Sequence, residues 1–376
     1  MDVTLTEDQL MLQDATRRFL NDRFPVDVLR KLADRGESLD REAWQEGAAL
    51  GWVALFVPEA HGGFAESAEG VIDAAIVAEE LGRVVHSGPF FSSCVLADAI
   101  ARAGSEAQQA AWLPGLAAGE QIGAWCVAGP GPNDGISPGS VRATRSDDGR
   151  YVLEGVAGYV DDAAAADLLL VTAAVDAGLS QFLLPAGAAG VSVQPLEALD
   201  LGRRVATVRF DRAVVGAEAL LGEWGGAADH VERQLQVVLA LLVAETVGVI
   251  DRVFEFTLEW VNQRYAFNRP IGSYQALKHR LADHAAQLEG AKAAAAYAAR
   301  AVQAGASDAA IAVSVAKSHC GRVATEIIRD CLQMHGGIGM TWEHDIHFYL
   351  RRAVSSEALW GSPRVHHERL CRLAGL

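Results

Sequence analysis

The C-terminal part of the chain most constrains the fold, because it contains three long stretches with a helical pattern. The first, residues 230–262, contains no proline. The second and third, residues 277–304 and 308–334, are rich in alanine and are separated only by a short break. Proline in a helix interior costs about 3 kcal/mol and alanine has the highest helix propensity, so both features favour long helices. Long helices with short links predict a helix bundle.

Two regions of different character precede this bundle. Residues 1–120 have patterns that predict helices, and Thr6 with Gln9 matches the pattern of a capping box. Residues 121–222 contain short apolar or alternating runs, such as residues 206–210, punctuated by Gly, Pro and Asp. That rhythm is typical of antiparallel strands. We predict an α+β chain with three domains: an N-terminal α-helical domain (1–120), a middle antiparallel β-barrel (121–222) and a C-terminal four-helix bundle (223–376).

Composition excludes several classes of protein. Hydrophobic residues make up 51% and charged residues 21%, which is typical of a globular chain. The net charge of −16 argues against a nucleic-acid partner, since phosphate binding needs clustered cations. The five cysteines form no C-x-x-C pair, so we expect neither a disulfide framework nor a zinc site. The first residues lack the features of a signal peptide and the longest apolar run, residues 237–244, is too short to span a bilayer. We therefore expect a cytoplasmic protein without membrane insertion.

Histidines invite a metal hypothesis, because His344 and His347 are three residues apart and His366 and His367 are adjacent. A metal ion needs a third and a fourth ligand with convergent geometry, and nothing in the spacing supplies them. We expect no metal site. Residues 129–139, rich in Gly and Pro, lack the lysine of a phosphate-binding P-loop and are predicted to be a connection within the barrel.

Two motifs carry a family resemblance. Residues 264–275 read R-Y-A-F-N-R-P-I-G-S-Y-Q, and residues 333–339 read Q-M-H-G-G-I-G. They resemble the R-x-x-F-G-x-P-I-x-x-F-Q and Q-x-x-G-G-x-G motifs of acyl-CoA dehydrogenases. Residues 57–63 (V-P-E-A-H-G-G) and 79–82 (E-E-L-G) match the N-terminal domain of the same family. The resemblance extends over essentially the whole chain, and several matches in the right order are more specific than any one of them.

The resemblance implies an activity and a cofactor. The family uses FAD to remove two hydrogens across Cα–Cβ of an acyl-CoA thioester, with a carboxylate as the base. Each FAD lies between two subunits: one holds the flavin ring and supplies the glutamate, and its neighbour holds the pyrophosphate and adenosine. An arginine fork suits a pyrophosphate, and glycines let backbone N–H groups approach it. By this resemblance, FAD contacts are expected from Arg264, Ala266, Phe267, Tyr274, Gln275, Gln333, Met334, His335, Gly336 and Gly337.

The flavin-ring half of the site departs from the family pattern. In place of T-E-P-x-x-G-S-D, residues 127–135 read V-A-G-P-G-P-N-D-G, and in place of W-x-T, residues 159–162 read Y-V-D-D. In place of Y-E-G-T, residues 360–363 read W-G-S-P. Gly361 therefore occupies the position of the catalytic glutamate and cannot accept a proton. Some relatives carry the glutamate on an earlier helix, where this chain has Val238.

Glu245 is the nearest carboxylate to that alternative position, two turns further along the same predicted helix. It is a weak candidate for a relocated base. The other interpretation is a polar contact within the helix bundle.

Loss of one half of the site with retention of the other resembles the heteromeric acyl-CoA dehydrogenases of actinobacteria, several of which act in sterol side-chain degradation. The resemblance implies an α2β2 assembly with a paralogous subunit that supplies the glutamate, an acyl-CoA substrate and electron-transfer flavoprotein as the acceptor. Three alternatives stay open: a self-sufficient homomeric enzyme that uses Glu245, an oxygen-using flavoenzyme on the same fold, and a scaffold paralogue without a flavin site. Retention of Arg264 and of the turn after Gln333 counts against the last.

Overall fold

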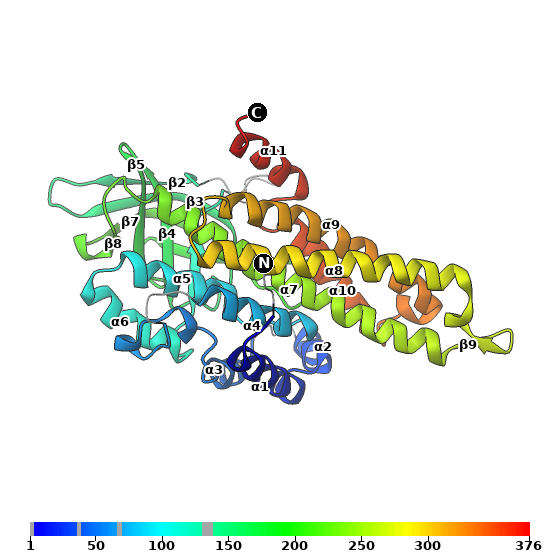
Figure 1. Ribbon diagram of the computed structural model, residues 1–376. Helices are drawn as coiled ribbons and strands as arrows, with labels where there is room; N and C mark the ends of the chain where they lie inside the picture. Colours follow the sequence, from blue (N-terminus) through cyan, green and yellow to red (C-terminus); the bar gives the residue numbers. More distant parts are fainter. Residues whose placement is uncertain (1–3, 36–38, 66–69, 130–137) are drawn as a thin grey trace.

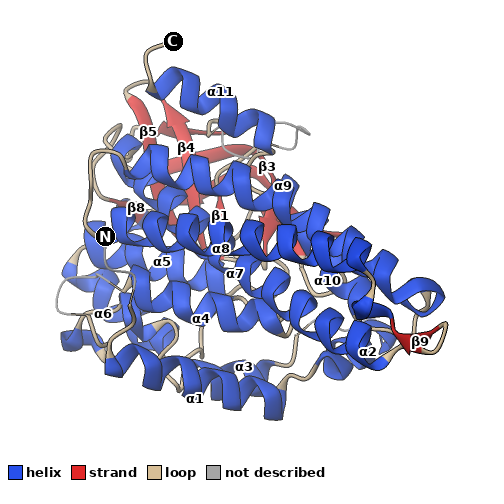
Figure 2. Ribbon diagram, turned by 45° about the vertical axis from the view of Figure 1, so that its right-hand side comes forward, coloured by secondary structure: helices blue, strands red, loops and turns tan. Residues whose placement is uncertain are grey.

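The computed structural model of the chain describes residues 4–35, 39–65, 70–129 and 138–376. The N-terminal helices and the C-terminal bundle pack against each other, and a β-sheet lies at one end of both (Figure 1). Seen after a turn of the molecule, the helices lie in front of the sheet (Figure 2). The predicted order of helices, sheet and helices is confirmed.

The N-terminal region consists of helices that enclose one large apolar core together with the bundle. Thr6 caps the first helix with the predicted capping box, its hydroxyl oxygen accepting from the Gln9 amide at 3.2 Å. The helices are α1 (Glu7–Arg23), α2 (Val26–Arg35), α3 (Arg41–Ala48), α4 (Val71–Arg83), α5 (Phe90–Ala103) and α6 (Glu106–Ala117).

The sheet has the strand order β6-β7-β3-β2-β4-β5-β8, with β1 paired to β4. Most pairs are antiparallel, but β1 and β2 each pair with β4 in parallel. The sheet expected as an antiparallel barrel is therefore mainly antiparallel, with parallel pairs at β4. The reason is that β1 follows α6 and reaches β4 only after the intervening β2–β3 pair, a connection long enough for parallel pairing. The strands are β1 (Gly123–Cys126), β2 (Val141–Arg145), β3 (Tyr151–Asp161), β4 (Leu168–Val175), β5 (Gly178–Pro185), β6 (Val191–Leu196), β7 (Val205–Val215) and β8 (Leu220–Leu221).

Strand β4 faces two cores at once. Leu168 and Leu170 belong to the helical core, whereas Leu169 and Val171 belong to the core inside the sheet. This alternation follows from the period of two along a strand. Trp125, on the neighbouring strand β1, points to the helical side. The sheet thus presents an aromatic side chain to the space between sheet and helices, where the flavin-ring half of the family site is expected.

The bundle is built around one long buried helix. Helix α7 (Ala228–Gln263) is buried around its whole circumference between Val237 and Ile250, and all but two of these residues are apolar or glycine, which suits a helix surrounded by others. The three predicted helices correspond to α7, α8 (Gln275–Gln303) and α9 (Ala309–His335), and α10 (Ile346–Ala358) and α11 (Pro363–Leu373) complete the bundle.

Helices α4 and α7 cross at two glycines. A Cβ at Gly248 would lie 1.9 Å from the carbonyl oxygen of Glu79, and one at Gly82 would lie 2.1 Å from that of Glu245. Only glycine permits so close an approach of two backbones. The contact explains the E-E-L-G motif and holds the centre of α7 against the N-terminal helices.

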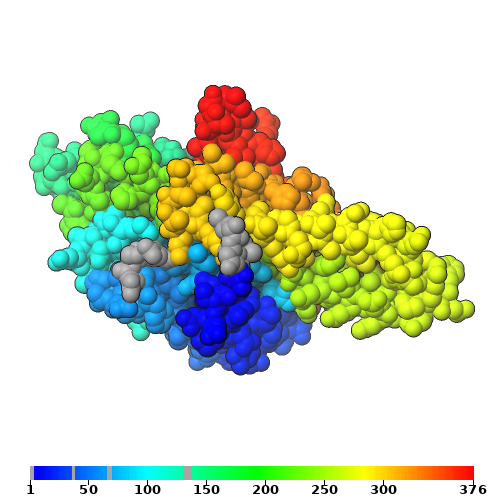
Figure 3. Space-filling view, viewed as in Figure 1, coloured from blue at the N-terminus to red at the C-terminus, as the bar shows by residue number. Residues whose placement is uncertain are grey.

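The ends of α7 and α8 extend beyond the rest of the molecule. They are joined by a hairpin of β9 (Tyr265–Ala266) and β10 (Arg269–Pro270), which lies at the extreme end of the long axis (Figure 1). The space-filling view shows this extension standing clear of the N-terminal helices (Figure 3). Within residues 4–35, 39–65, 70–129 and 138–376, no helix combines the length and apolarity needed to cross a membrane.

Candidate functional site

The hairpin at the end of α7 displays Phe267. Its two-residue connection, Phe267 and Asn268, has φ values of 52° and 62°, the sign that a type I′ turn requires at both positions. Asn tolerates this left-handed region, but a phenylalanine there is strained, and such strain concentrates at functional positions. Phe267 is also 92% exposed. The hairpin therefore exposes the Phe267 ring to solvent, and the backbone conformation of this residue is strained.

Contacts from the following segment fix this hairpin. The Tyr274 hydroxyl donates to the Ala266 carbonyl at 3.0 Å, and the Arg269 guanidinium lies 3.9 Å from the centroid of the Tyr274 ring. The Ile271 amide donates to the Arg264 carbonyl at 2.8 Å. Each bond closes a short loop, so the hairpin keeps one orientation relative to α7.

The second motif begins at the end of α9 and lies beside the hairpin. The Trp260 indole N–H, from α7, donates to the Met334 carbonyl at 3.2 Å. Met334 packs against Val261 of α7 and Leu281 of α8. The two motifs, separated by some sixty residues in sequence, therefore form one surface, which we call the tip (residues 264–275 and 333–340).

The predicted FAD contacts divide into two groups on the tip. Ala266 and Tyr274 are half-buried, and Met334 and His335 are buried, so these four support the surface. Added Cβ atoms at Gly336 and Gly337 would meet nothing within 4 Å, so the turn has open space in front of its backbone. The exposed members are Arg264, Phe267, Gln275, Gln333, Gly336 and Gly337.

The other half of the family site, which we call the inner site (residues 125, 161, 238, 360 and 361), is filled by side chains. Trp360 stacks on Trp125 with ring centroids 5.3 Å apart and an interplanar angle of 21°. The spaces beside this stack measure about 10 and 20 Å³. Each is large enough for about one water molecule. Val127 and Ala128 line one of these spaces, and residues 130–135 of the same segment lie outside the described part of the chain.

Gly361 has φ +97°, a region that L side chains rarely adopt. A Cβ there would lie 3.1 Å from His366 Nε2. A glutamate at this position would require a different backbone path.

Glu245 lies in a buried ion-pair network. Its two carboxylate oxygens accept from Arg352 at 2.6 Å and from Arg203 at 2.5 Å, and its side chain is only 4% exposed. Arg352 also contacts Asp200 and donates to the His86 carbonyl at 3.0 Å. The geometry favours the polar-contact role of Glu245 over the role of a base.

Asp161 is a buried carboxyl that sequence reasoning missed. It is 9% exposed, and neither oxygen has a hydrogen-bond partner among the described residues. Burial raises its pKa to about 7, with Arg203 opposing the shift. It borders the cavities on both sides of the inner site. The alignment of Y-V-D-D with W-x-T pointed to this position, but the sequence could not indicate that its neighbour Asp162, and not Asp161, pairs with Arg204.

Replacing Asp161 by asparagine is expected to stabilise the chain at pH 8. An aspartate with a pKa near 3.9 when unfolded and about 7 when folded binds more protons in the folded state between these values. Its contribution to stability therefore falls as the pH rises from 4 to 7, and the charged form is unfavourable above pH 7. The gain from Asp161→Asn, a few kcal/mol at most, should be largest at pH 8 and vanish towards pH 4. Thermal unfolding across this range measures it, and an equal effect at both ends would contradict this account.

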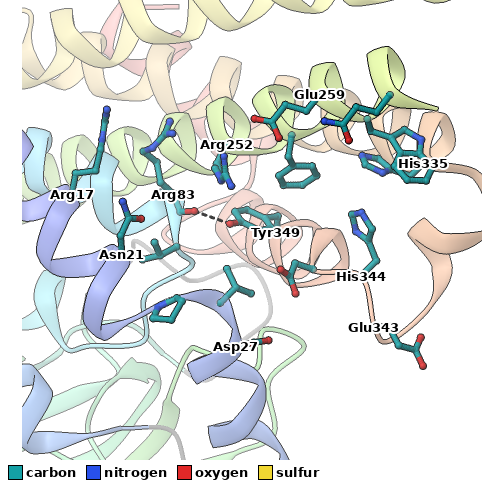
Figure 4. A pocket seen from close by; sticks show the side chains of 17 residues that line it. Arg17, Asn21, Asp27, Arg83, Arg252, Glu259, His335, Glu343, His344 and Tyr349 are labelled. Carbon is teal, nitrogen blue, oxygen red and sulfur yellow. Dashed lines mark hydrogen bonds between the residues drawn. The ribbon is translucent and has the colours of Figure 1, made fainter. Parts of the chain in front are cut away.

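Another cavity lies elsewhere in the described part of the chain. It is a cleft of about 730 Å³ between α1–α2, the outer half of α7 and the start of α10, and it shares no lining residue with the inner site. Arginine and glutamate side chains both line it, among them Arg17, Arg83 and Glu259 (Figure 4). Arg17 pairs with Glu80 at 2.6 Å, and Arg83 pairs with Glu255 at 2.6 Å and also contacts Asp251. These cations are thus neutralised by the protein itself.

Comparisons with known proteins agree with these observations. Residues 6–120 match the family model "Acyl-CoA dehydrogenase, N-terminal domain", and residues 228–373 match "Acyl-CoA dehydrogenase, C-terminal domain". The chain is 31% identical over 374 residues to "Acyl-CoA dehydrogenase IpdE2" of Mycobacterium tuberculosis, with 98% of each protein covered. The chain belongs to the acyl-CoA dehydrogenase family. Acyl-CoA dehydrogenases are oxidoreductases, and their cofactor is FAD.

Two similar solved structures are each named for a pair of chains. One is the ChsE4–ChsE5 complex of Mycobacterium tuberculosis, with a TM-score of 0.89 and 28% identity over 100% of this chain and 99% of that one. The other is a variant of the Tcur3481-Tcur3483 steroid ACAD, with a TM-score of 0.89 and 27% identity over 99% of both chains.

The residues present fit FAD at one half-site only. The tip offers an arginine without an ion-pair partner among the described residues, an exposed aromatic ring and open backbone around two glycines. The inner site has no room for a flavin ring beside the Trp125–Trp360 stack.

Proposed function

We propose that this chain is the subunit of a heteromeric acyl-CoA dehydrogenase that binds the pyrophosphate and adenosine of FAD. A paralogous partner subunit holds the flavin ring and supplies the glutamate that removes the α-proton of an acyl-CoA substrate, and electron-transfer flavoprotein takes the electrons. The observation that carries this proposal is the contrast between a complete tip and a filled inner site with Gly361 at the base position.

The tip suits a phosphate-bearing ligand for physical reasons. A guanidinium donates two parallel hydrogen bonds to neighbouring phosphate oxygens, which makes Arg264 the anchor of the site. Gly336 and Gly337 leave open space in front of the turn, so that a ligand can approach its backbone closely, and Phe267 offers a planar apolar surface. FAD, once bound, supplies the hydride acceptor.

The inner site argues for a second chain. Pockets that bind ligands of this kind measure roughly 300–1,000 Å³, whereas the spaces around Trp360 reach about 20 Å³. A flavin ring could enter only after the two tryptophans separate.

The relatives give independent support. ChsE4–ChsE5 is a complex of two chains, and Tcur3481-Tcur3483 is named as a steroid ACAD. An acyl-CoA that carries a steroid-derived side chain is therefore the first substrate class to test.

The test compares this chain alone with the chain co-expressed with a paralogue that has T-E-P-x-x-G-S-D and a catalytic glutamate. Alone, the chain is expected to hold little FAD and to show no acyl-CoA dehydrogenation with a dye acceptor. With the partner it should gain both. A flavin-replete and active homo-oligomer would instead establish a self-sufficient enzyme, in which Asp161 is the first carboxyl to replace, since Glu245 is held by two arginines.

A further inference from the structure

Arg264 stands at the end of α7, where the backbone leaves the helix with ψ 122°. Its side chain is exposed, and an unrestrained arginine loses rotamer freedom when it is ordered. Its guanidinium carbon lies 5.9 Å from the centroid of the Trp260 ring, within the range of a cation–π contact. Trp260 thus restricts the directions that the guanidinium can take before a ligand arrives.

Trp260 is itself fixed from the other motif. Its N–H donates to the Met334 carbonyl at 3.2 Å, and the His335 ring stacks on it with centroids 5.2 Å apart and an interplanar angle of 25°. Both contacts come from the turn after α9. The indole therefore joins the segment that carries Arg264 to the segment that carries Gly336 and Gly337.

His335 is held in one orientation and one tautomer. The Thr257 hydroxyl donates its only proton to the Val253 carbonyl at 2.7 Å, so its oxygen accepts from His335 Nε2–H at 3.2 Å. Nδ1 then carries no proton and has no partner among the described residues. Burial, with a further contribution from His344, lowers the pKa of His335 to about 4. The ring is neutral under ordinary conditions and does not repel the cation of Arg264.

The wall of the cleft is formed by these same rings. His335 and Trp260 line it with Phe256 and His344, and Figure 4 labels His335 and His344 side by side at one end. His335 and His344 meet edge to face, with centroids 4.5 Å apart. Since open space lies on the cleft side, the position of Trp260 depends on its own bond and stack and less on surrounding packing.

We propose that Trp260 and His335 are positioning residues that join the two motifs of the tip and aim the Arg264 guanidinium at the pyrophosphate of FAD. This role rests on the proposed function, because it gives Arg264 its ligand. Neither residue touches the cofactor in this proposal. Trp260 acts through Arg264, and His335 acts through Trp260.

Replacement of Trp260 distinguishes a role in positioning Arg264 from a role in the stability of the whole fold. In the isolated chain, Trp260→Leu should raise the hydrogen-exchange rates of residues 264–271 and 336–340 at least tenfold. In the complex with the partner, it should raise the FAD dissociation constant about tenfold. Trp260→Phe keeps a ring for Arg264 and His335 but loses the indole N–H, and it should restore most of the affinity. Trp224→Leu is the matched control, because Trp224 also stacks on an aromatic ring, Tyr151, at 5.2 Å and 15°, but lies in the sheet region.

Replacement of His335 tests whether this residue acts on Arg264 through Trp260. His335→Phe keeps a ring against Trp260 and should leave the FAD dissociation constant within about twofold of wild type, whereas His335→Ala should raise it about tenfold. Thr257→Val removes the hydroxyl that accepts from His335 and should have a smaller effect than His335→Ala. Equal affinity for wild type, Trp260→Leu and His335→Ala would overturn the proposal.

Arg264→Gln in the same complex distinguishes a failure of the positioning role from a failure of the proposed function. If Arg264→Gln releases FAD but Trp260→Leu does not, the positioning role is wrong and the proposed function stands. If neither variant changes FAD affinity, Arg264 does not bind FAD and the proposed function fails with it. Loss of affinity in both variants, with exchange raised at the tip and not in the sheet, supports the positioning role.

Discussion

Replacing Arg264 by glutamine is expected to weaken FAD binding by the complex about 100- to 1,000-fold. The substitution removes the charge and the paired donors that would contact the pyrophosphate, and charge-assisted hydrogen bonds contribute roughly 1.5–3 kcal/mol each. Every 1.4 kcal/mol is about a factor of ten in the dissociation constant. Arg264 makes no ion pair among the described residues, so the fold should not change.

Equilibrium dialysis or flavin fluorescence on the assembled complex measures this effect. Arg264→Lys keeps the charge without the planar fork and should give an intermediate dissociation constant. Arg145→Gln, an exposed arginine on β2, is the matched control and should bind FAD as wild type does. Unchanged affinity in Arg264→Gln would remove the tip from the cofactor site.

Replacing Arg352 by methionine is expected to cause the largest loss of stability of any single change discussed here. Arg352 is 1% exposed and contacts the carboxylates of Glu245 and Asp200 together with the His86 carbonyl. Its removal leaves the buried carboxylates of Glu245 and Asp200 with Arg203 as their remaining cationic partner. Breaking a buried ion pair by removing one partner costs about 3–5 kcal/mol. Urea unfolding of the isolated chain, followed by circular dichroism, gives the difference.

The neighbouring residue provides the control for this measurement. Arg351 is half-buried and donates one bond to the Leu199 carbonyl at 3.2 Å, so Arg351→Met should change stability by no more than about 1 kcal/mol. Similar losses for both variants would mean that the Arg352 network contributes little.

Glu245→Gln tests the same network from its acidic side. It is expected to destabilise the chain, because Glu245 forms ion pairs with Arg203 and Arg352. It should leave turnover by the complex intact. Abolished turnover with unchanged stability would restore Glu245 as a base.

The sequence predicted those parts of the molecule that depend on local pattern. The capping box at Thr6, the proline-free helix around Val238 and the strand-like runs all reflect short-range chemistry, and the structure contains each of them. The two motifs of the tip are also continuous in sequence, so their residues could be named individually. The division at residues 120 and 222 stays a prediction.

The inner site and the buried ion-pair network of Glu245 could not be predicted in this way, because their residues come from distant segments. Arg352, Glu245 and Arg203 lie on α10, on α7 and in the loop before β7, and no spacing rule relates them. The stack of Trp125 on Trp360 joins the sheet to the turn after α10. The parallel pairing of β1 with β4 has the same origin, since local alternation indicates strands but not their partners.

The flavin content of the intact complex tests whether two unlike chains share one FAD site. Native mass spectrometry of the co-purified chains, with FAD measured by its absorbance after release, gives the number of flavins for each pair of unlike chains. We expect one FAD per pair, because this chain contributes a tip and its partner contributes the flavin-ring half. One FAD on every chain, or a flavin-replete assembly of this chain alone, would contradict it.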